Sequence, residues 1–296
     1  MLSDYIDLYL ANSRDSKTEG TYLGEVPIAS SLKRCMASLD ITSFEQLKYE
    51  SYHEIVRYYK VFTRCKNASI NKYIAYLKAI LRHFGQITHP FLLTKKLPDD
   101  TTHTRTIKRS DLMKIMCYVT DHNKNKNSIV YRAAIYLLYE TGCRISELLA
   151  IKIKNVNVVD RWILLEKTKN HKTRVVPYSH LGALVMSDLI RKNKQSSFLF
   201  WNQIKDRRLE YNDIKLYLRD MMEVLDINHV HPHMFRKTMA TSLVEKGAKM
   251  KTVQTLLGHE LMSTTEIYTE YSSKTAVKDY FKHDISQGVI SAIENR

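Results

Sequence analysis

One stretch of the chain constrains its fold more than any other: residues 69–84, which read SINKYIAYLKAILRHF. Apolar side chains recur there every three or four positions, a spacing that places them on one face of an α-helix. These side chains are Ile70, Tyr73, Ile74, Leu77, Ile80, Leu81 and Phe84. Ser69 is the expected N-cap of this helix. Lys72, Lys78 and Arg82 fall roughly on the opposite face, which is either solvated or laid against phosphates.

The first hundred residues are expected to be mostly helical. Weaker helical patterns occupy about residues 3–12, 29–39 and 50–64, which predicts a small all-helical domain over residues 1–97. A proline, two adjacent aspartates and several threonines then interrupt the pattern. We therefore expect residues 98–105 to be an interdomain linker.

The remainder, residues 106–296, is expected to form a second, mixed domain. SDLMKIMCYV and SIVYRAAIYLLYETG are helical patterns, and Gly142 is the expected C-terminal cap of the second. RWILLEK and TRVVPYS are rich in β-formers and flank a polar turn, so they predict a hairpin. The chain is helical again from about residue 209. The fold class is thus mainly α with one small β-sheet, in two domains.

The formal net charge of +15 is concentrated in the middle of the chain. Residues 1–50 carry 5 basic and 8 acidic side chains, residues 51–200 carry 27 and 10, and residues 201–296 carry 14 and 13. The middle part therefore has an excess of 17 basic groups. Evenly spread charge would serve solubility alone, but a localised field of one sign favours a polyanion, so we expect nucleic acid as the partner.

The composition favours an intracellular protein. Four cysteines, Cys35, Cys65, Cys117 and Cys143, form no CxxC pair, which suits free thiols in a reducing compartment better than disulfides or a zinc ribbon. The start, MLSDYIDLYL, lacks the basic segment of a signal peptide. The longest purely apolar run, AAIYLLY, has seven residues and is too short to span a membrane. We expect a cytoplasmic, DNA-associated protein without a membrane partner.

Two basic stretches of the second domain are candidate functional segments. In ETGCRISELLA, Arg144 follows a helix end and precedes an amphipathic segment, so it can project from a bend. In EKTKNHKTRVVP, basic or imidazole side chains crowd the turn of the expected hairpin: Lys167, Lys169, His171, Lys172 and Arg174. Taken alone, each stretch fits an ordinary solvated turn, and the alternative for the hairpin is a basic finger that enters a DNA groove.

Two later stretches place histidines near helix ends. In HPHMFRKTMATSLVEKG, His233 and Arg236 lie at a helix N-terminus, where unpaired amides and the helix dipole favour an anion. In LLGHELMSTTEIYTEYS, His259 lies in a loop and Tyr268 in the early turns of the next helix. Taken singly, a histidine there is commonly a structural cap, and a helical tyrosine is commonly a core residue.

Together, and in this order, the four stretches closely resemble the tyrosine recombinase (phage integrase) family. Its catalytic domain reads T-G-x-R-x-S-E-L, a hairpin lysine before R-V-V-P, H-x-L-R-H-T-x-A-T, and L-G-H with a tyrosine nine residues on. The chain has TGCRISEL, TKNHKTRVVP, HMFRKTMAT and LLGHELMSTTEIY. The helix at residues 69–84 also looks like the last helix of the family's core-binding domain. Phe235 and Lys237 depart from the family's leucine and second histidine, which leaves DNA contacts near Lys237 open.

The resemblance implies a catalytic set whose chemistry suits transesterification of a phosphodiester. A tyrosine hydroxyl with a pKa of about 10 is only ~0.1% ionised at pH 7, so the nucleophile Tyr268 needs help. Arg144 and Arg236 would hold the phosphate oxygens through charge-assisted hydrogen bonds. By resemblance, His233 assists proton removal from Tyr268 and His259 donates to a nonbridging oxygen. Lys169 would protonate the leaving 5′ oxygen, with Lys167 and Lys172 as rivals.

The resemblance also implies what this chemistry works on. The expected function is site-specific DNA recombination through a 3′-phosphotyrosyl intermediate and a Holliday junction, with no metal and no cofactor. The expected partners are double-stranded DNA with specific recombination sites and, through a C-terminal tail, three further copies in a homotetramer. The DNA-binding candidates are Lys72, Lys78, Arg82, Lys167, His171, Lys172, Arg174 and Lys237.

Two alternatives share the expected fold. A type IB topoisomerase uses the same chemistry as a monomer, and a DNA-binding regulator would have lost the chemistry. An apolar stripe after the tyrosine argues against the first: Val277, Phe281, Ile285, Val289 and Ile293. Such a stripe suits docking onto a neighbouring protomer, or folding back on its own domain. The presence of Arg144, Arg236, His259 and Tyr268 argues against the second.

Overall fold

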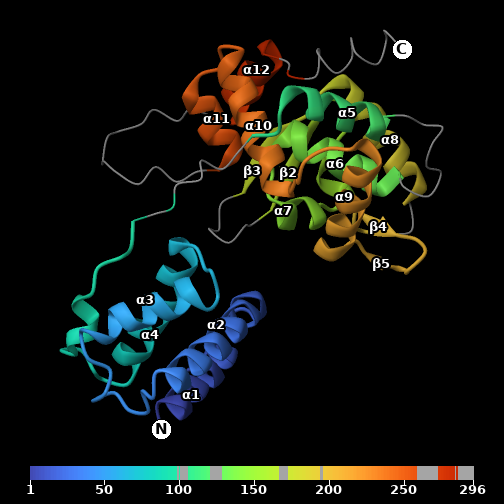
Figure 1. Cartoon of the computed structure of the whole chain (residues 1–296). Helices are drawn as coiled ribbons and strands as arrows, with labels where there is room; N and C mark the ends of the chain where they lie inside the picture. Colours follow the sequence, from blue (N-terminus) through green and yellow to red (C-terminus); the bar gives the residue numbers. More distant parts are fainter. Residues whose placement is uncertain are drawn as a thin grey trace. The chain divides into compact units, whose positions relative to one another are not determined.

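The computed structural model divides the chain into two compact units, residues 1–103 and residues 104–296. Figure 1 shows both, coloured along the sequence. The structure describes residues 1–98, 100, 106–120, 129–166, 173–193, 196–258, 273–283 and 285. Each unit has its own cluster of buried apolar side chains.

Unit 1 is helical, as the sequence predicts. Its helices are α1 (Leu2–Ser16), α2 (Glu19–Ser38), α3 (Ser51–Val61) and α4 (Asn67–His83), followed by the short 3-10 helix η1 (Pro90–Leu93). The predicted apolar face of α4 is buried at Ile70, Ile74, Leu77, Ile80 and Leu81, and Tyr76 is buried as well. This face closes the core of unit 1 against α1 and α2.

The start of α4 differs from the prediction. Its N-cap is Lys66 rather than Ser69, and the Lys66 side chain makes no capping hydrogen bond. The free amide of Asn67 instead donates to a carboxylate oxygen of Asp100 at 2.5 Å. The cap therefore comes from a residue 33 positions away, which no local pattern could indicate.

Unit 2 is built around one buried helix. Its elements are α5 (Arg109–Thr120), α6 (Ile129–Thr141), α7 (Ile145–Leu149), η2 (Ile153–Asn155), β1 (Val156–Asn157), β2 (Trp162–Leu165), β3 (Arg174–Pro177), α8 (His180–Lys192), β4 (Trp201–Asn202), β5 (Arg207–Arg208), α9 (Tyr211–Leu225), α10 (Pro232–Glu245), α11 (Met250–Leu257) and α12 (Ser273–Lys282). Every side chain of α6 from Arg132 to Thr141 is buried. Such a helix belongs at the centre of a domain, and α5, α8, α9 and α10 pack on it.

Helix α6 ends where the sequence predicts. Gly142 follows it with φ +58, a left-handed conformation that costs glycine little. A Cβ at this position would also lie 2.9 Å from Cε of Met239 in α10. The glycine therefore both stops the helix and lets α10 approach it, two residues before Arg144.

The β-structure is larger than predicted. Strands β2 and β3 form the expected antiparallel hairpin, with Ile163 opposite Val176, and β1 adds a third strand on the other side of β2. The expected fold class, mainly α with little β-structure, is confirmed, but β4 and β5 add a second, two-stranded sheet that was not predicted. Strands of two residues are too short to show an alternating pattern in the sequence. Helix α8, which Ser179 caps through the Gly182 amide, was not anticipated either.

Helix α12 packs on its own unit. Ala276, Tyr280 and Ile285 are buried in the core of unit 2, and Phe281 packs against it. The Tyr280 hydroxyl donates to the Glu140 carbonyl at 3.2 Å. The first part of the predicted apolar stripe thus folds back in cis, and Val289 and Ile293 lie outside the described residues. In the part of the chain that the structure describes, no helix is long and apolar enough to cross a membrane.

Candidate active site

Arg144 lies at the turn between α6 and α7, where the sequence placed it. It is the N-cap of α7, and its backbone amide donates to the Glu147 carboxylate at 2.8 Å. Its Nη1 donates to the other oxygen of the same carboxylate at 2.9 Å, while 42% of the side chain is exposed. One edge of the guanidinium is therefore held in place and part of the side chain remains open to a ligand.

Glu147 is the centre of the site, and sequence reasoning missed it. Its two oxygens also accept a fork from Arg174, at 3.0 Å from Nη1 and 2.6 Å from Nη2. Burial alone would raise the pKa of Glu147, but the bonds from Arg174 and Arg144 outweigh it and lower the pKa. The carboxylate is therefore ionised. The available signal was an acid at the third helical position after Arg144, where a capping carboxylate is common.

Arg174 corrects one prediction. It was placed among the DNA-binding side chains of an exposed turn, but only 8% of it is exposed. Besides the fork to Glu147, its Nε donates to the carbonyl of Leu256 in α11 at 2.8 Å. The guanidinium is thus used inside unit 2, because partners that lie 27 and 82 residues away in sequence enclose it.

Arg236, in the second turn of α10, is a buried cation whose described hydrogen bonds reach only main-chain carbonyls. It is 3% exposed, and it donates from Nη1 to the Gly142 carbonyl at 2.7 Å and from Nη2 to the Leu257 carbonyl at 2.6 Å. Burial, then the charges of Arg144 and Arg174, lower the pKa of Arg236 to about 10. The group still carries its charge at pH 7, in a place where positive charge is unfavourable.

The end of α11 receives both buried arginines. The last carbonyls of a helix lack partners within the helix and carry partial negative charge. Arg174 binds the carbonyl of Leu256, and Arg236 binds that of Leu257. Gly258 then turns the chain with φ +63, and a Cβ there would lie 3.1 Å from Cδ of Arg174. The residue immediately after this turn is His259.

His233 lies one turn before Arg236 on α10 and is exposed. Its pKa is lowered by burial first, and then by the charges of Lys237 and Arg236. A lowered pKa keeps the imidazole neutral at pH 7, the form that accepts a proton. Lys237 is half-buried on the same helix.

The structure places only some of the predicted site residues. It brings together Arg144, His233 and Arg236, from α7 and α10. The remaining members fall outside the described residues: Lys167, Lys169, His171, Lys172, His259 and Tyr268. Their described neighbours do adjoin the cluster, because β3 begins at Arg174 and α11 ends one residue before Gly258.

The DNA-binding candidates on α4 separate into two kinds. Lys72 and Arg82 are exposed on the side away from the core. Lys78 instead donates from Nζ to the carbonyls of Leu92 at 3.0 Å and Thr94 at 2.5 Å. Burial, then Arg82, lower the pKa of Lys78. The prediction of Lys78 as a DNA ligand is thus corrected, because its ammonium binds η1 and the residue that follows it to α4.

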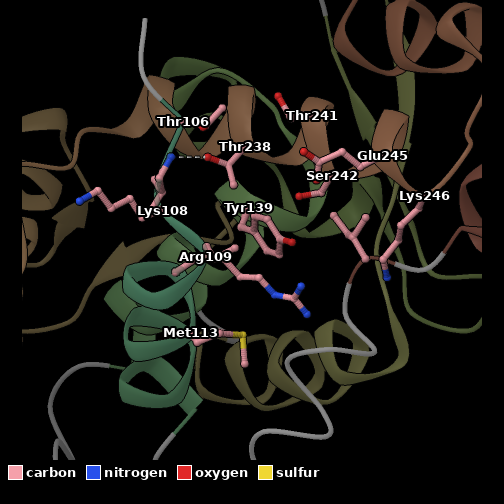
Figure 2. A pocket seen from close by; sticks show the side chains of 13 residues that line it. Thr106, Lys108, Arg109, Met113, Tyr139, Thr238, Thr241, Ser242, Glu245 and Lys246 are labelled. Atoms are coloured by element: carbon pink, nitrogen blue, oxygen red, sulfur yellow. Dashed lines mark hydrogen bonds between the residues drawn. The ribbon is translucent and has the colours of Figure 1, made fainter.

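A separate cavity lies on another side of α10. Figure 2 shows Thr238, Thr241, Ser242 and Glu245 of that helix along a cavity of about 640 Å³, with Arg109 entering from α5. The Thr238 hydroxyl accepts a hydrogen bond from the Ile107 amide at 2.9 Å. Arg144, Arg174 and Arg236 form what we call the arginine cluster, and none of them lines this cavity. Helix α10 therefore presents the arginine cluster and the cavity through different side chains.

The chain is similar to known proteins over most of its length. Residues 105–275 match the model of the phage integrase family. The probable integrase/recombinase of Acholeplasma phage L2 is 32% identical over 283 residues, which cover 96% of each chain. The tyrosine recombinase XerC of Bacillus pumilus is 28% identical over 267 residues, 84% of this chain and 85% of that one. A lambda integrase tetramer bound to a Holliday junction has the same fold, with TM-score 0.68, 17% identity and coverage of 91% and 80%.

Proposed function

The chain belongs to the phage integrase family and is a site-specific recombinase, and from this premise we propose that Arg144 and Arg236 of its arginine cluster bind the scissile phosphate of a DNA recombination site. One observation carries the proposal. Arg236 is 3% exposed, it donates hydrogen bonds to two main-chain carbonyls, and the charges of Arg144 and Arg174 outweigh that of Glu147 around it. Buried positive charge that exceeds the nearby negative charge destabilises the folded protein unless an anion neutralises it. A phosphodiester supplies that anion.

The roles in strand cleavage follow from the groups present. Arg144 and Arg236 hold the nonbridging oxygens, where negative charge grows as the nucleophile adds. Tyr268 attacks the phosphorus and passes its proton to neutral His233. His259 donates a hydrogen bond to a nonbridging oxygen. Glu147 is a positioning residue that keeps Arg144 in place.

Each half of the reaction forms one phosphorus–oxygen bond as it breaks another. The bond from the Tyr268 oxygen to phosphorus forms as the bond from phosphorus to the 5′ oxygen breaks, and Lys169 gives the leaving oxygen its proton. The product is a 3′-phosphotyrosine and a free 5′ hydroxyl. Attack by the 5′ hydroxyl of a second duplex reverses the step and joins the exchanged strands, so that two exchanges pass through a Holliday junction. The bond energy stays in the phosphotyrosine.

A nicked suicide substrate tests this function. A nick close to the cleavage point lets the short 5′ fragment diffuse away, so a phosphotyrosyl enzyme accumulates and runs as a slower band on a denaturing gel. We expect that band with DNA that carries the recombination site, and no such band with unrelated DNA. A protein that binds the site and never forms the adduct would be the inert regulator of the same fold.

The homotetramer is the second part of the proposal. Since α12 and Ile285 pack on their own unit, we assign docking onto a neighbouring copy to residues 286–296. Deleting those residues should preserve single-site DNA binding and weaken the four-protomer synapse on a native gel. The matched control is Val289→Asp with Ile293→Asp in the full chain, which removes the apolar character alone. Normal synapsis in both proteins would refute a role of the tail in trans.

A further inference from the structure

Arg174 joins three segments of unit 2 that are far apart in sequence. It is the first residue of β3 and thus belongs to the hairpin that carries Lys169. Its fork grips Glu147 of α7, and its Nε binds the Leu256 carbonyl near the end of α11. These three bonds, of 2.6–3.0 Å, use both edges of one guanidinium that is 8% exposed.

Each of these segments adjoins a residue that the proposed chemistry needs. The hairpin holds Lys169, Glu147 holds Arg144, and α11 leads through Gly258 into His259. The turn at Gly258 lies directly on the arginine, since a Cβ there would approach its Cδ, Nη1 and Nε within 3.1–3.3 Å. A shift of Arg174 would therefore move all three segments at once.

Stability alone is a poor reason for this arrangement. A buried ion pair loses so much hydration that apolar side chains of similar volume often serve stability equally well. What a planar guanidinium offers is direction, because its donors are fixed in one fork that matches a carboxylate. A lysine could pair with Glu147, but its ammonium lacks the planar fork that holds both carboxylate oxygens while a separate donor, Nε, binds the Leu256 carbonyl.

We propose that Arg174 is a positioning residue for strand cleavage, which sets the Lys169 hairpin, Arg144 and the His259 turn in register with one another. This inference rests on the proposed function, because it assigns Arg174 to the geometry of that reaction rather than to DNA binding. A misplacement of about 1 Å in a catalytic group can cost roughly 100-fold in rate. The effect of losing the fork should thus appear in the rate of cleavage at saturating DNA.

The test is Arg174→Lys, measured by single-turnover adduct formation on nicked DNA over a range of protein concentrations. We expect the rate at saturation to fall about 10–100-fold, while the half-saturating concentration stays within about twofold of wild type. The matched control is Arg207→Lys, which breaks a comparable fork to Asp213 at 2.8 and 3.0 Å. That control should cleave at the wild-type rate. Circular dichroism at the assay temperature fixes the folded fraction of each protein.

A second variant covers the case in which Arg174→Lys does not fold. Gly258→Ala keeps every charge and pushes a methyl group onto the Arg174 side chain, so it should also lower the saturating rate. Wild-type rates in a folded Arg174→Lys or Gly258→Ala protein would overturn the inference. Weaker DNA binding at an unchanged rate would make Arg174 a DNA-binding residue instead. If wild-type protein itself formed no adduct, the proposed function would fall, and the inference with it.

Discussion

Unit 2 contains two clusters in which one acidic side chain meets two basic ones, and they differ in what surrounds them. Glu147 binds Arg144 and Arg174. Asp213, at the start of α9, binds Lys205 at 2.9 Å and Arg207 at 2.8 Å. Both carboxylates also cap a helix, since each accepts a bond from the backbone amide at the N-cap. As local motifs the two clusters are nearly the same.

The difference lies in the balance of charge. Around Asp213 the cations are 51% and 33% exposed, and Arg207 has a second acid in Glu210 at 3.2 Å. Around Glu147, Arg174 is 8% exposed. A third arginine, Arg236, is also buried, and its charge interacts with those of Arg174 and Glu147. Exposure to solvent and a second carboxylate balance the positive charge of the first cluster. The second keeps a surplus of buried positive charge.

This contrast indicates how to separate a structural ion cluster from a functional one. A balanced cluster at the surface adds a modest amount to stability. A buried cluster with surplus charge costs stability, and such features collect where a ligand of opposite charge is bound. The comparison therefore supports a structural role for Asp213 and the proposal that Arg144 and Arg236 bind the phosphate.

The largest expected effect separates binding from bond breaking. Tyr268→Phe leaves both clusters intact and removes one oxygen, so adduct formation should vanish while DNA affinity is retained. Denaturing gels of nicked DNA and a gel-shift titration measure the two. An adduct that persists in this variant would assign the nucleophile to another residue, such as Tyr271.

The next effect tests the surplus charge directly. Arg236→Ala removes a donor aimed at growing negative charge, which should slow adduct formation by about 10²–10³-fold. Arg207→Ala in the balanced cluster should leave the rate within about twofold. Single-turnover assays at saturating DNA make the comparison. Equal losses in the two variants would show that the charge balance does not mark the site.

A smaller effect concerns the pH dependence of cleavage. Burial and then Lys237 lower the pKa of His233, so the rate should fall with decreasing pH only below the usual histidine value of about 6.5. Lys237→Gln removes one of the charges that lower the pKa of His233. The pKa should therefore rise, and the fall of the cleavage rate should begin at a higher pH. Lys205→Gln in the other cluster should not move that pH. If the pH at which the rate falls were unchanged in Lys237→Gln, His233 would not be the base.

The smallest effect belongs to the balanced cluster. The pKa of Asp213 is about 2, the net result of burial, which raises it, and of the bonds from Lys205 and Arg207, which lower it further. Because the folded value lies below the unfolded one, the stabilisation is complete above about pH 4 and is lost as pH falls toward 2. Asp213→Asn should lower Tm by roughly 2–6 °C at pH 7, and less in acid. Thermal unfolding at pH 7, 4 and 3 checks this, and a constant difference would contradict it.

The sequence by itself determined the elements that depend on neighbouring residues. The spacing of apolar side chains located α4, the β-rich segments located the β2–β3 hairpin, and Gly142 located the end of α6. The four motifs, in order, identified the family, which the comparisons confirm. The roles of Lys169, His259 and Tyr268 come from those motifs and stay predictions, since these residues lie outside the described ranges. Motifs and periodicities are local, so one chain displays them in full.

Only the tertiary structure decided which basic side chains are bound within the chain. Arg174 and Lys78 looked like the other basic side chains, yet one is bound to Glu147 and the other to two carbonyls. Arg236 reaches a carbonyl 94 residues away in the sequence, and Arg174 one that is 82 residues away. A basic residue in a sequence carries its charge but no information about its partner. Folding determines the partner, and in this chain it buries Arg236 where positive side chains outnumber negative ones.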